Sequence, residues 1–263
     1  MNYWIFLTLS GVLALAGCAV QQQQGSSVTP LDSTSSDTDS DLRSRARIRT
    51  ELAAGYFDAR NMGVALEEIL TAIRTDSTYG PAYNIAGLIY AELRDDRQAE
   101  QHFQTALRIN AADPEANNNY GMFLCNRKRE EQAVKHFLAA IRNPLYQTPE
   151  LAYVNAGLCV WQRGDMNGAE DYFRNALKLR PNNVQALFHL ASISYQRGSL
   201  EQARAYIRPL LPVASQSAAI LWLALRTERK LGDVNSEASF ALQLRRNFPD
   251  SAEAQALAAG RFE

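Results

Sequence analysis

The stretch PEANNNYGMFLCNRKREEQAVKHFLAAIRN, residues 114–143, decides the fold. The small residue Gly121 is followed after twelve residues by Ala133, then after four more by Phe137 and after three more by Ala140. Spacings of four and three place apolar residues on one face of a helix. The charged run NRKREE lies between the two apolar segments and is typical of a turn. The stretch therefore predicts two helices joined by a short turn.

The same spacing recurs along the chain with a period near 34 residues. Small residues in the place of Gly121 are separated by 34, 34, 36 and 34 residues; they are Ala53, Gly87, Gly121, Gly157 and Ala191. The three later places recur in step: Ala65, Ala99, Ala133, Ala169 and Ala203; Ile69, Phe103, Phe137, Phe173 and Ile207; Ala72, Ala106, Ala140, Ala176 and Leu210. A single unit of this kind cannot bury its apolar face alone, so neighbouring units must stack.

This period and pattern resemble the tetratricopeptide repeat. The resemblance implies an all-α superhelical solenoid of about six helix-turn-helix units, with repeats starting near residues 46, 80, 114, 150, 184 and 218. The extra residues of the 36-residue step fall in RNPLYQTPE, residues 142–150. The last unit, 218–251, matches poorly and is expected to be a terminal cap. The final segment, 251–263, is expected to be a short amphipathic helix that seals the last seam.

The N-terminus has the pattern of an export signal. Residues 3–17 form an apolar run, which is too short for a membrane-spanning helix. The run ends in Leu15-Ala16-Gly17-Cys18, which resembles the bacterial lipobox. The resemblance implies a signal peptide over 1–17 and an acylated Cys18. Because Ala19 rather than Asp follows the cysteine, it favours the periplasmic face of the outer membrane, with the acyl chains in the bilayer.

The lipobox has one departure and one alternative. No Lys or Arg lies in 2–17, and an ordinary anchor helix with an accidental cysteine is the other interpretation. The following residues, 18–41, are polar and rich in Ser, Thr, Asp and Gln. Such a segment cannot bury enough surface to fold, so a flexible tether is expected. The solenoid is then expected over 42–263.

Composition and motifs narrow the function classes. The chain has 263 residues and a formal net charge of −1, so no general basic field favours nucleic acid. Its three histidines, His102, His136 and His189, form no cluster with metal-ligand spacing. No phosphate-binding loop or nucleophile motif is found, and no cofactor or catalytic residue is predicted. An enzyme with a repeat accessory domain is disfavoured because the repeats occupy nearly all of 42–263.

Two further cysteines fall late in the predicted first helices of adjacent units. Cys125 is the twelfth residue of the third repeat and Cys159 the tenth of the fourth. In an oxidising compartment a disulfide between neighbouring first helices is expected. The alternative is two buried thiols, because Cα atoms more than about 7 Å apart cannot pair.

The concave groove of such a solenoid is the expected binding surface. The residues predicted to face a partner are Asn84, Leu88, Asn118, Asn119, Met122, Asn155, Leu158, Trp161 and Phe188. Apolar groups with interleaved amides suit an extended or helical peptide, because Asn can pair with the partner's backbone. Basic groups are scarce among them. The alternative for each residue is a role in the solenoid core or in a helix cap.

The blocks DPEANNNYGMFLC at 113–125 and NPLYQTPELAYVNAGLC at 143–159 make the whole mature chain resemble the PilF/PilW family of type IV pilus biogenesis lipoproteins. The resemblance implies an outer-membrane, pilotin-like factor. Such a factor binds the pilus secretin subunit and promotes its localisation and multimerisation in the outer membrane. The alternative is a general tetratricopeptide scaffold lipoprotein that recruits envelope-processing enzymes.

Overall fold

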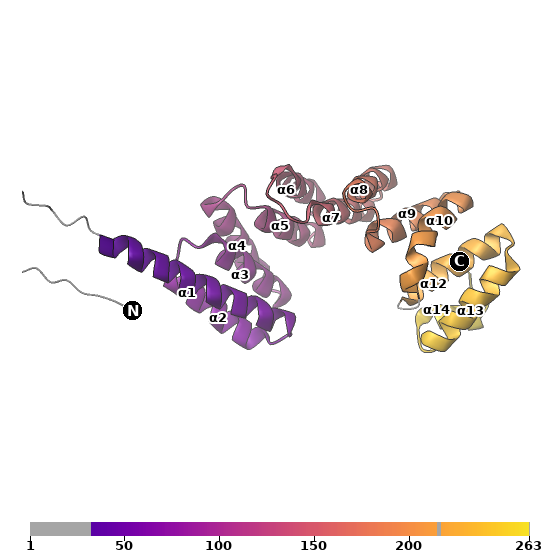
Figure 1. The fold of residues 1–263 in the computed structure, drawn as a ribbon, viewed down its shortest axis with the longest axis horizontal. Coiled ribbons are helices and arrows are strands. Elements are labelled where there is room, and N and C mark those ends of the chain that lie inside the picture. The colour runs from indigo at the N-terminus through magenta and orange to yellow at the C-terminus, as the bar shows by residue number, and fades with distance from the viewer. Residues whose placement is uncertain (1–32, 215–216, 263) are drawn as a thin grey trace, which may run out of the picture.

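The computed structural model describes residues 33–214 and 217–262, and all regular secondary structure in these ranges is helical (Figure 1). The helices pair in chain order into six units that form an arch. The first three pairs are α1 (Ser33–Asp58) with α2 (Met62–Thr75), α3 (Gly80–Glu92) with α4 (Asp96–Ile109), and α5 (Pro114–Asn126) with α6 (Glu130–Arg142). The expected all-α tetratricopeptide solenoid is confirmed.

The second half of the arch is less regular. Its pairs are α7 (Pro149–Gln162) with α8 (Met166–Leu179), α9 (Val184–Gln196) with α10 (Leu200–Ile207), and α12 (Ala218–Leu231) with α13 (Val234–Asn247). The short turn η1 (Arg208–Leu210) and α11 (Leu211–Ala214) follow α10, and α14 (Ala252–Ala258) follows α13. The first helices of the second, third, fifth and sixth units begin at the expected residues 80, 114, 184 and 218, and α7 begins one residue early.

The first unit begins earlier than the sequence predicted. Helix α1 starts at Ser33, so residues 33–41 are helical although 18–41 was expected to be a flexible tether. Extending an existing helix adds one backbone hydrogen bond per residue and needs no new nucleus. Arg43, just beyond this extension, pairs with Asp76 and donates to the Thr78 hydroxyl at 2.8 Å. The rest of the segment, 18–32, which includes Cys18, lies outside the described residues, as does the expected signal peptide over 1–17.

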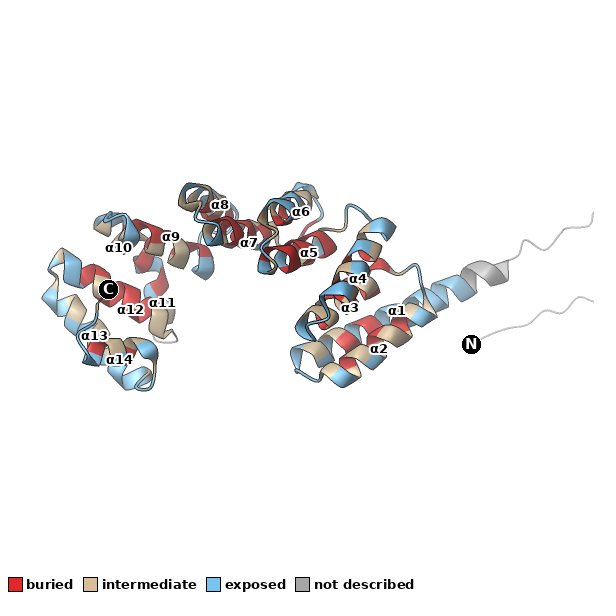
Figure 2. Cartoon of the chain, turned by 180° about the vertical axis from the view of Figure 1, so that it is seen from behind, coloured by how far each residue is buried: buried red, intermediate tan, exposed pale blue. Residues whose placement is uncertain are grey.

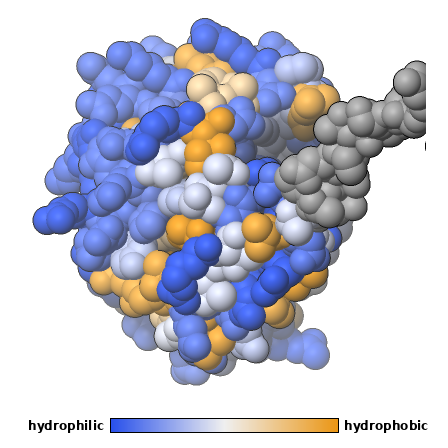
Figure 3. Space-filling view, turned by 90° about the vertical axis from the view of Figure 1, so that its left-hand side faces the viewer, coloured by the Kyte–Doolittle hydropathy of each residue, from blue (hydrophilic) through white to orange (hydrophobic). Residues whose placement is uncertain are grey.

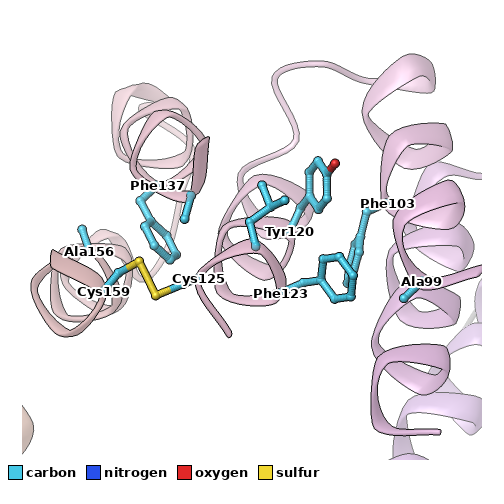
Figure 4. Packing of buried hydrophobic residues seen from close by; sticks show 10 residues of the cluster. Ala99, Phe103, Tyr120, Phe123, Cys125, Phe137, Ala156 and Cys159 are labelled. Carbon is cyan, nitrogen blue, oxygen red and sulfur yellow. A yellow bond between two sulfur atoms is a disulfide. The ribbon is translucent and has the colours of Figure 1, made fainter. Parts of the chain in front are cut away.

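Each middle unit packs a phenylalanine of its second helix against a glycine of its first. Phe137, labelled in Figure 4, has no exposed surface. A Cβ atom at Gly121 would lie 2.7 Å from its ring. The same relation joins Gly87 to Phe103 and Gly157 to Phe173. Any larger residue at these glycines would have to displace the ring, so the close approach of the two helices requires glycine there.

The turn between the paired helices has the same backbone conformation in all six units. The fifteenth residue of each repeat has a positive φ: Arg60, Arg94, Lys128, Gly164, Gly198 and Gly232, with values from 58° to 90°. The left-handed conformation favours glycine because a Cβ atom is crowded there. The three N-terminal units therefore hold a residue with a side chain in this left-handed conformation, whereas the three C-terminal units hold a glycine in it.

The two-residue insertion before α7 is filled by a tyrosine. Tyr146 is 6% exposed and packs with Ala140 and Ala152. Asn143 anchors the start of the insertion, because its side-chain Nδ2 donates to the Ala112 carbonyl at 2.6 Å. The stacking of the third and fourth units thus continues across the longer step.

Buried residues line the contacts between first and second helices along the whole arch (Figure 2). At the C-terminal end Leu257 of α14 joins a cluster with Trp222, Leu225 and Leu244, and so covers the last seam as expected. Within the described residues, none of the helices has both the length and the apolar content needed to span a bilayer.

Candidate functional site: the inner surface of the solenoid

The first helices of the units form the inner surface of the arch. Neighbouring first helices contact one another, as α1 does with α3 and α3 with α5, while each second helix packs between its own first helix and the next one. The first helices therefore follow the shorter, concave side (Figure 1). We use the term inner surface for the repeat positions five, six, nine, twelve and thirteen of α3, α5, α7, α9 and α12.

The structure places the nine predicted contact residues along this inner surface. Asn84 and Asn118 are buried, and Met122 is 40% exposed. The other six are half-buried; they are Leu88, Asn119, Asn155, Leu158, Trp161 and Phe188. Their binding of a partner stays a prediction.

Four of the asparagines form a continuous chain of hydrogen bonds. Asn155 Nδ2 donates to Asn118 Oδ1 at 2.9 Å, Asn118 Nδ2 to Asn119 Oδ1 at 3.5 Å, and Asn119 Nδ2 to Asn84 Oδ1 at 3.2 Å. We call this the asparagine ladder; it crosses from α7 through α5 to α3. All its bonds point the same way, so each polarises the next.

The ladder changes the role that the sequence suggested for these amides. We expected them to pair with a partner's backbone, but within the described chain they pair mostly with one another. Asn84 Nδ2 and Asn155 Oδ1, one at each end of the ladder, have no protein partner among the described residues. The ladder therefore offers one donor at α3 and one acceptor at α7.

A pocket of about 280 Å³ opens on the inner surface beside the ladder. Leu88, Asn119 and Met122 line it together with Phe57 of α1 and Phe123 of α5. The rest of the lining includes a second amide, Asn126, and the charged side chains of Glu92, Arg94 and Arg127. Apolar groups with a few polar ones are typical of peptide or small-ligand pockets, and exposed methionine adapts to varied partners. This pocket joins three of the predicted contact residues into one concave site.

Aromatic side chains continue the inner surface toward the C-terminal end. The His189 ring stacks on Phe173 at 5.0 Å between centroids and meets Trp161 edge-on at 5.3 Å. Burial lowers the pKa of His189 to about 4, and its Nδ1 atom is buried without a hydrogen-bond partner. The ring is thus neutral at ordinary pH and acts as an aromatic packing group.

Cys125 and Cys159 form a disulfide between α5 and α7 (Figure 4). Their Cα atoms are 5.7 Å apart, within the range that the sequence argument required. Cys159 is fully buried and Cys125 is 7% exposed. The bridge fixes the third unit to the fourth directly beside the asparagine ladder.

The other two histidines have packing roles. His102 stacks on Tyr90 at 5.1 Å, and His136 Nδ1 lies 2.9 Å from Asn117 Oδ1. Burial lowers the pKa of both rings. In the ranges that the structure describes, no group of three His, Cys, Asp or Glu side chains is arranged to hold a metal ion.

Sequence reasoning missed two surfaces. One is the contribution of the sixth unit, where Arg226 and Lys230 occupy repeat positions nine and thirteen; counting from Ala218 would have found them. The other is the outer face of α1, where Ile48, Leu52 and Tyr56 are 39–48% exposed. Figure 3 views the molecule from this end, where hydrophobic patches interrupt the hydrophilic surface.

The outer face of α1 also carries a shallow hollow of about 440 Å³, which Ile48, Leu52 and Tyr56 line. Spacings of four residues along a terminal helix would have indicated this stripe. We call it the α1 stripe.

Comparisons with known proteins identify the repeats. A family model described as a tetratricopeptide repeat matches residues 86–150. A second model, described as the middle TPR-like domain of cilia and flagella-associated protein 70, matches residues 144–246. These matches agree with the repeat period.

Two named proteins are similar over most of the chain. The type IV pilus assembly protein PilF of Pseudomonas aeruginosa is 27% identical over 205 residues, which cover 78% of this chain and 81% of PilF. The crystal structure of PilW, described as a widely conserved type IV pilus biogenesis factor, is 31% identical and has a TM-score of 0.72. That match covers 81% of this chain and 98% of PilW.

A solved structure of P. aeruginosa PilF is also similar. It has a TM-score of 0.75 at 26% identity, and the match covers 84% of this chain and 99% of that structure.

Proposed function

Because this chain belongs to the PilF/PilW family of tetratricopeptide repeat proteins of type IV pilus biogenesis, we propose that it binds a peptide segment of the pilus secretin on its inner surface. By holding that segment it promotes secretin localisation and multimerisation in the outer membrane, and through this the formation of stable pili. No chemical step or cofactor is required for this role.

The observation that carries the proposal is the pocket of the inner surface beside the asparagine ladder. Leu88 and Met122 supply apolar area in the pocket. Outside it, the two ends of the asparagine ladder supply one donor, Asn84 Nδ2, and one acceptor, Asn155 Oδ1. An extended peptide offers complementary backbone groups and apolar side chains, so both kinds of contact can form at once.

The anchor is the second part of the proposal. We propose that Cys18 is acylated and holds the protein on the periplasmic face of the outer membrane, with the polar segment before α1 giving reach. Two or more acyl chains anchor stably, since each buried CH₂ contributes about 0.8 kcal/mol. Linking the binding surface to the membrane raises the local concentration of captured secretin there.

Photo-crosslinking in intact cells tests the surface. A photoreactive residue is placed at Met122 on the inner surface, at Tyr56 in the α1 stripe, and at Leu145, which is 77% exposed on the insertion loop. We expect a secretin peptide to be captured from Met122 and not from Leu145. Capture from Tyr56 alone would move the binding site to the α1 stripe and reject the inner surface.

Capture of an envelope-processing enzyme in place of the secretin would favour the scaffold alternative. The anchor is tested separately with Cys18→Ala. We expect that variant to lose secretin multimers from the outer membrane; normal assembly would reject the role of the anchor.

A further inference from the structure

Two cations of the sixth unit lie over one tyrosine at the C-terminal end of the inner surface. The Arg226 guanidinium carbon is 4.9 Å from the centre of the Tyr195 ring and 5.4 Å from that of Trp222. Lys230 Nζ is 4.4 Å from the centre of the same Tyr195 ring. These contacts bring α9 and α12 together around a pair of positive charges.

Neither cation has an acidic partner within the described part of the chain. The neighbouring Arg229 shows the contrast, because it pairs with Glu237 at 2.6 Å. Arg226 Nε is buried and has no hydrogen-bond partner. A buried N–H group that gives up water without gaining an acceptor is unfavourable, while the Arg226 residue as a whole is half-buried.

The two aromatic rings restrict the Arg226 side chain, which favours the binding of a planar anion. The Arg226 guanidinium carbon lies over both rings, and the N–H groups of a guanidinium form a planar fork that fits a carboxylate. Contact with two rings also limits the rotamers of the side chain, so less freedom is lost when an anion binds. Lys230, which is exposed, adds a second charge on the same ring.

The cation pair is continuous with the candidate peptide groove. Arg226 stands at the repeat position that Leu88, Met122 and Leu158 occupy in earlier units. The aromatic residues Trp161, His189 and Phe188 lie between these units and Tyr195. A flat lipid surface cannot enter a concave face, and two cations in a chain of net charge −1 do not form a nucleic-acid track.

We propose that Arg226 and Lys230 bind a carboxylate of the peptide that occupies the inner surface, which gives that peptide a fixed direction. Its apolar part lies over α3–α7 and its carboxylate lies at α9–α12. This inference rests on the proposed peptide-binding function and specifies the ligand. The carboxylate is an Asp or Glu side chain or the C-terminus of the peptide.

The test uses three fluorescent synthetic peptides with the same apolar first half. One ends in two Asp residues with an amidated terminus, one in two Asn residues with an amidated terminus, and one in two Asn residues with a free carboxylate. Fluorescence anisotropy gives the affinity of each for the full protein at low and at high salt. We expect the Asp peptide or the free-acid peptide to bind about tenfold more tightly than the amidated Asn peptide, and salt to reduce this difference.

The variant Arg226→Gln/Lys230→Gln should remove the difference while keeping the affinity for the amidated Asn peptide. Lys230→Gln alone changes only an exposed side chain and should lower the difference without affecting folding. The matched control Arg245→Gln/Arg246→Gln removes two exposed charges from α13 and should leave the difference intact.

Equal affinity of all three peptides for the unaltered protein would overturn the inference, as would the absence of binding, or a difference that survives in the Arg226→Gln/Lys230→Gln variant. Binding to phosphatidylglycerol vesicles that depends on the same two residues would also overturn it. Secretin capture at Met122 together with equal peptide affinities would reject the carboxylate site and keep the secretin as partner. Charge-dependent peptide binding without secretin capture would reject the secretin as partner and keep the site.

Discussion

In the third unit and in the sixth unit, the space between the two paired helices is filled from opposite sides. In the third unit the first helix supplies Gly121 and the second helix supplies the large ring of Phe137. In the sixth unit the first helix supplies the fully buried Leu225 and the second helix supplies Ala241 at the position of that ring. The comparison teaches that the repeat conserves the volume between its helices and not the identity of the residue on either side.

Transplanting the arrangement of the sixth unit into the third should have the largest effect. Phe137→Ala alone should lower the free energy of unfolding by about 4 kcal/mol, because it leaves a cavity. Gly121→Leu alone should lower it by about 3 kcal/mol, because its side chain would overlap the Phe137 ring. The double variant should recover at least about 2 kcal/mol of the summed loss.

Urea denaturation of the four proteins gives this double-mutant cycle. Strict additivity of the two losses would contradict conservation of volume as the rule. The control pair Gly55→Leu and Gly63→Leu concerns glycines with no neighbouring atom within 4 Å of an added Cβ, so neither should show a comparable overlap effect.

Reducing the disulfide should weaken the middle units and leave the sixth unit unchanged. A bridge across a 34-residue separation stabilises by about 3 kcal/mol through restriction of the unfolded chain. Hydrogen exchange with and without reductant should therefore show faster exchange of the slow amides in α5–α7 and no change in α12–α13. If amide exchange became faster to the same extent in both regions, the solenoid would unfold as one unit. The expected difference between α5–α7 and α12–α13 would then be contradicted.

Acid should weaken the junction between the fourth and fifth units next. The unfolded His189 takes up a proton near its ordinary pKa of 6.5, while the folded ring stays neutral until about pH 4. Stability is therefore complete above pH 6.5 and is lost as the pH falls toward 4, by about 3 kcal/mol. His189→Phe keeps the stacking on Phe173 and should remove this part of the pH dependence. Parallel curves for the two proteins in thermal melts would contradict the assignment.

The turns should give the smallest effect and should differ in sign between the two regions. Lys128→Gly in the third unit relieves a side chain at φ 58° and should stabilise by about 0.5–1 kcal/mol. Gly232→Ala in the sixth unit should destabilise by a similar amount of about 1 kcal/mol, although no atom lies within 4 Å of the added Cβ. Opposite shifts of Tm in differential scanning calorimetry would support the strain argument, and shifts of the same sign would refute it.

The fold was predictable because its signal is repeated. Gly121, Ala133 and Phe137 recur in register, so each copy corroborates the others, and four of six unit boundaries coincide with the start of a helix. The sixth unit matched poorly because Leu225 and Ala241 reverse the sizes that the pattern seeks. The start of α1 was misplaced because its polar composition carries no periodic signal, while Arg43 ties that end of the helix to Asp76.

The candidate site was predictable in position more than in chemistry. Counting repeat positions placed Met122 and Trp161 on the inner surface and brought Cys125 near Cys159. Counting could not show that Asn118 and Asn119 bond to neighbouring amides, because that depends on side-chain geometry across units. Arg226 was missed because the count stopped at the fifth unit, where no basic residue occupies an inner position.

The disulfide between α5 and α7 has a mechanical meaning. A solenoid pulled at its N-terminus unravels helix by helix, so α1–α4 can peel away in turn and lengthen the chain. Further extension is then stopped by the covalent bond between the two cysteines. The 34-residue loop closed by Cys125 and Cys159 withholds roughly 110 Å of contour length. Under load, the α5–α7 segment closed by the disulfide limits the extension, and the two units before it supply the length.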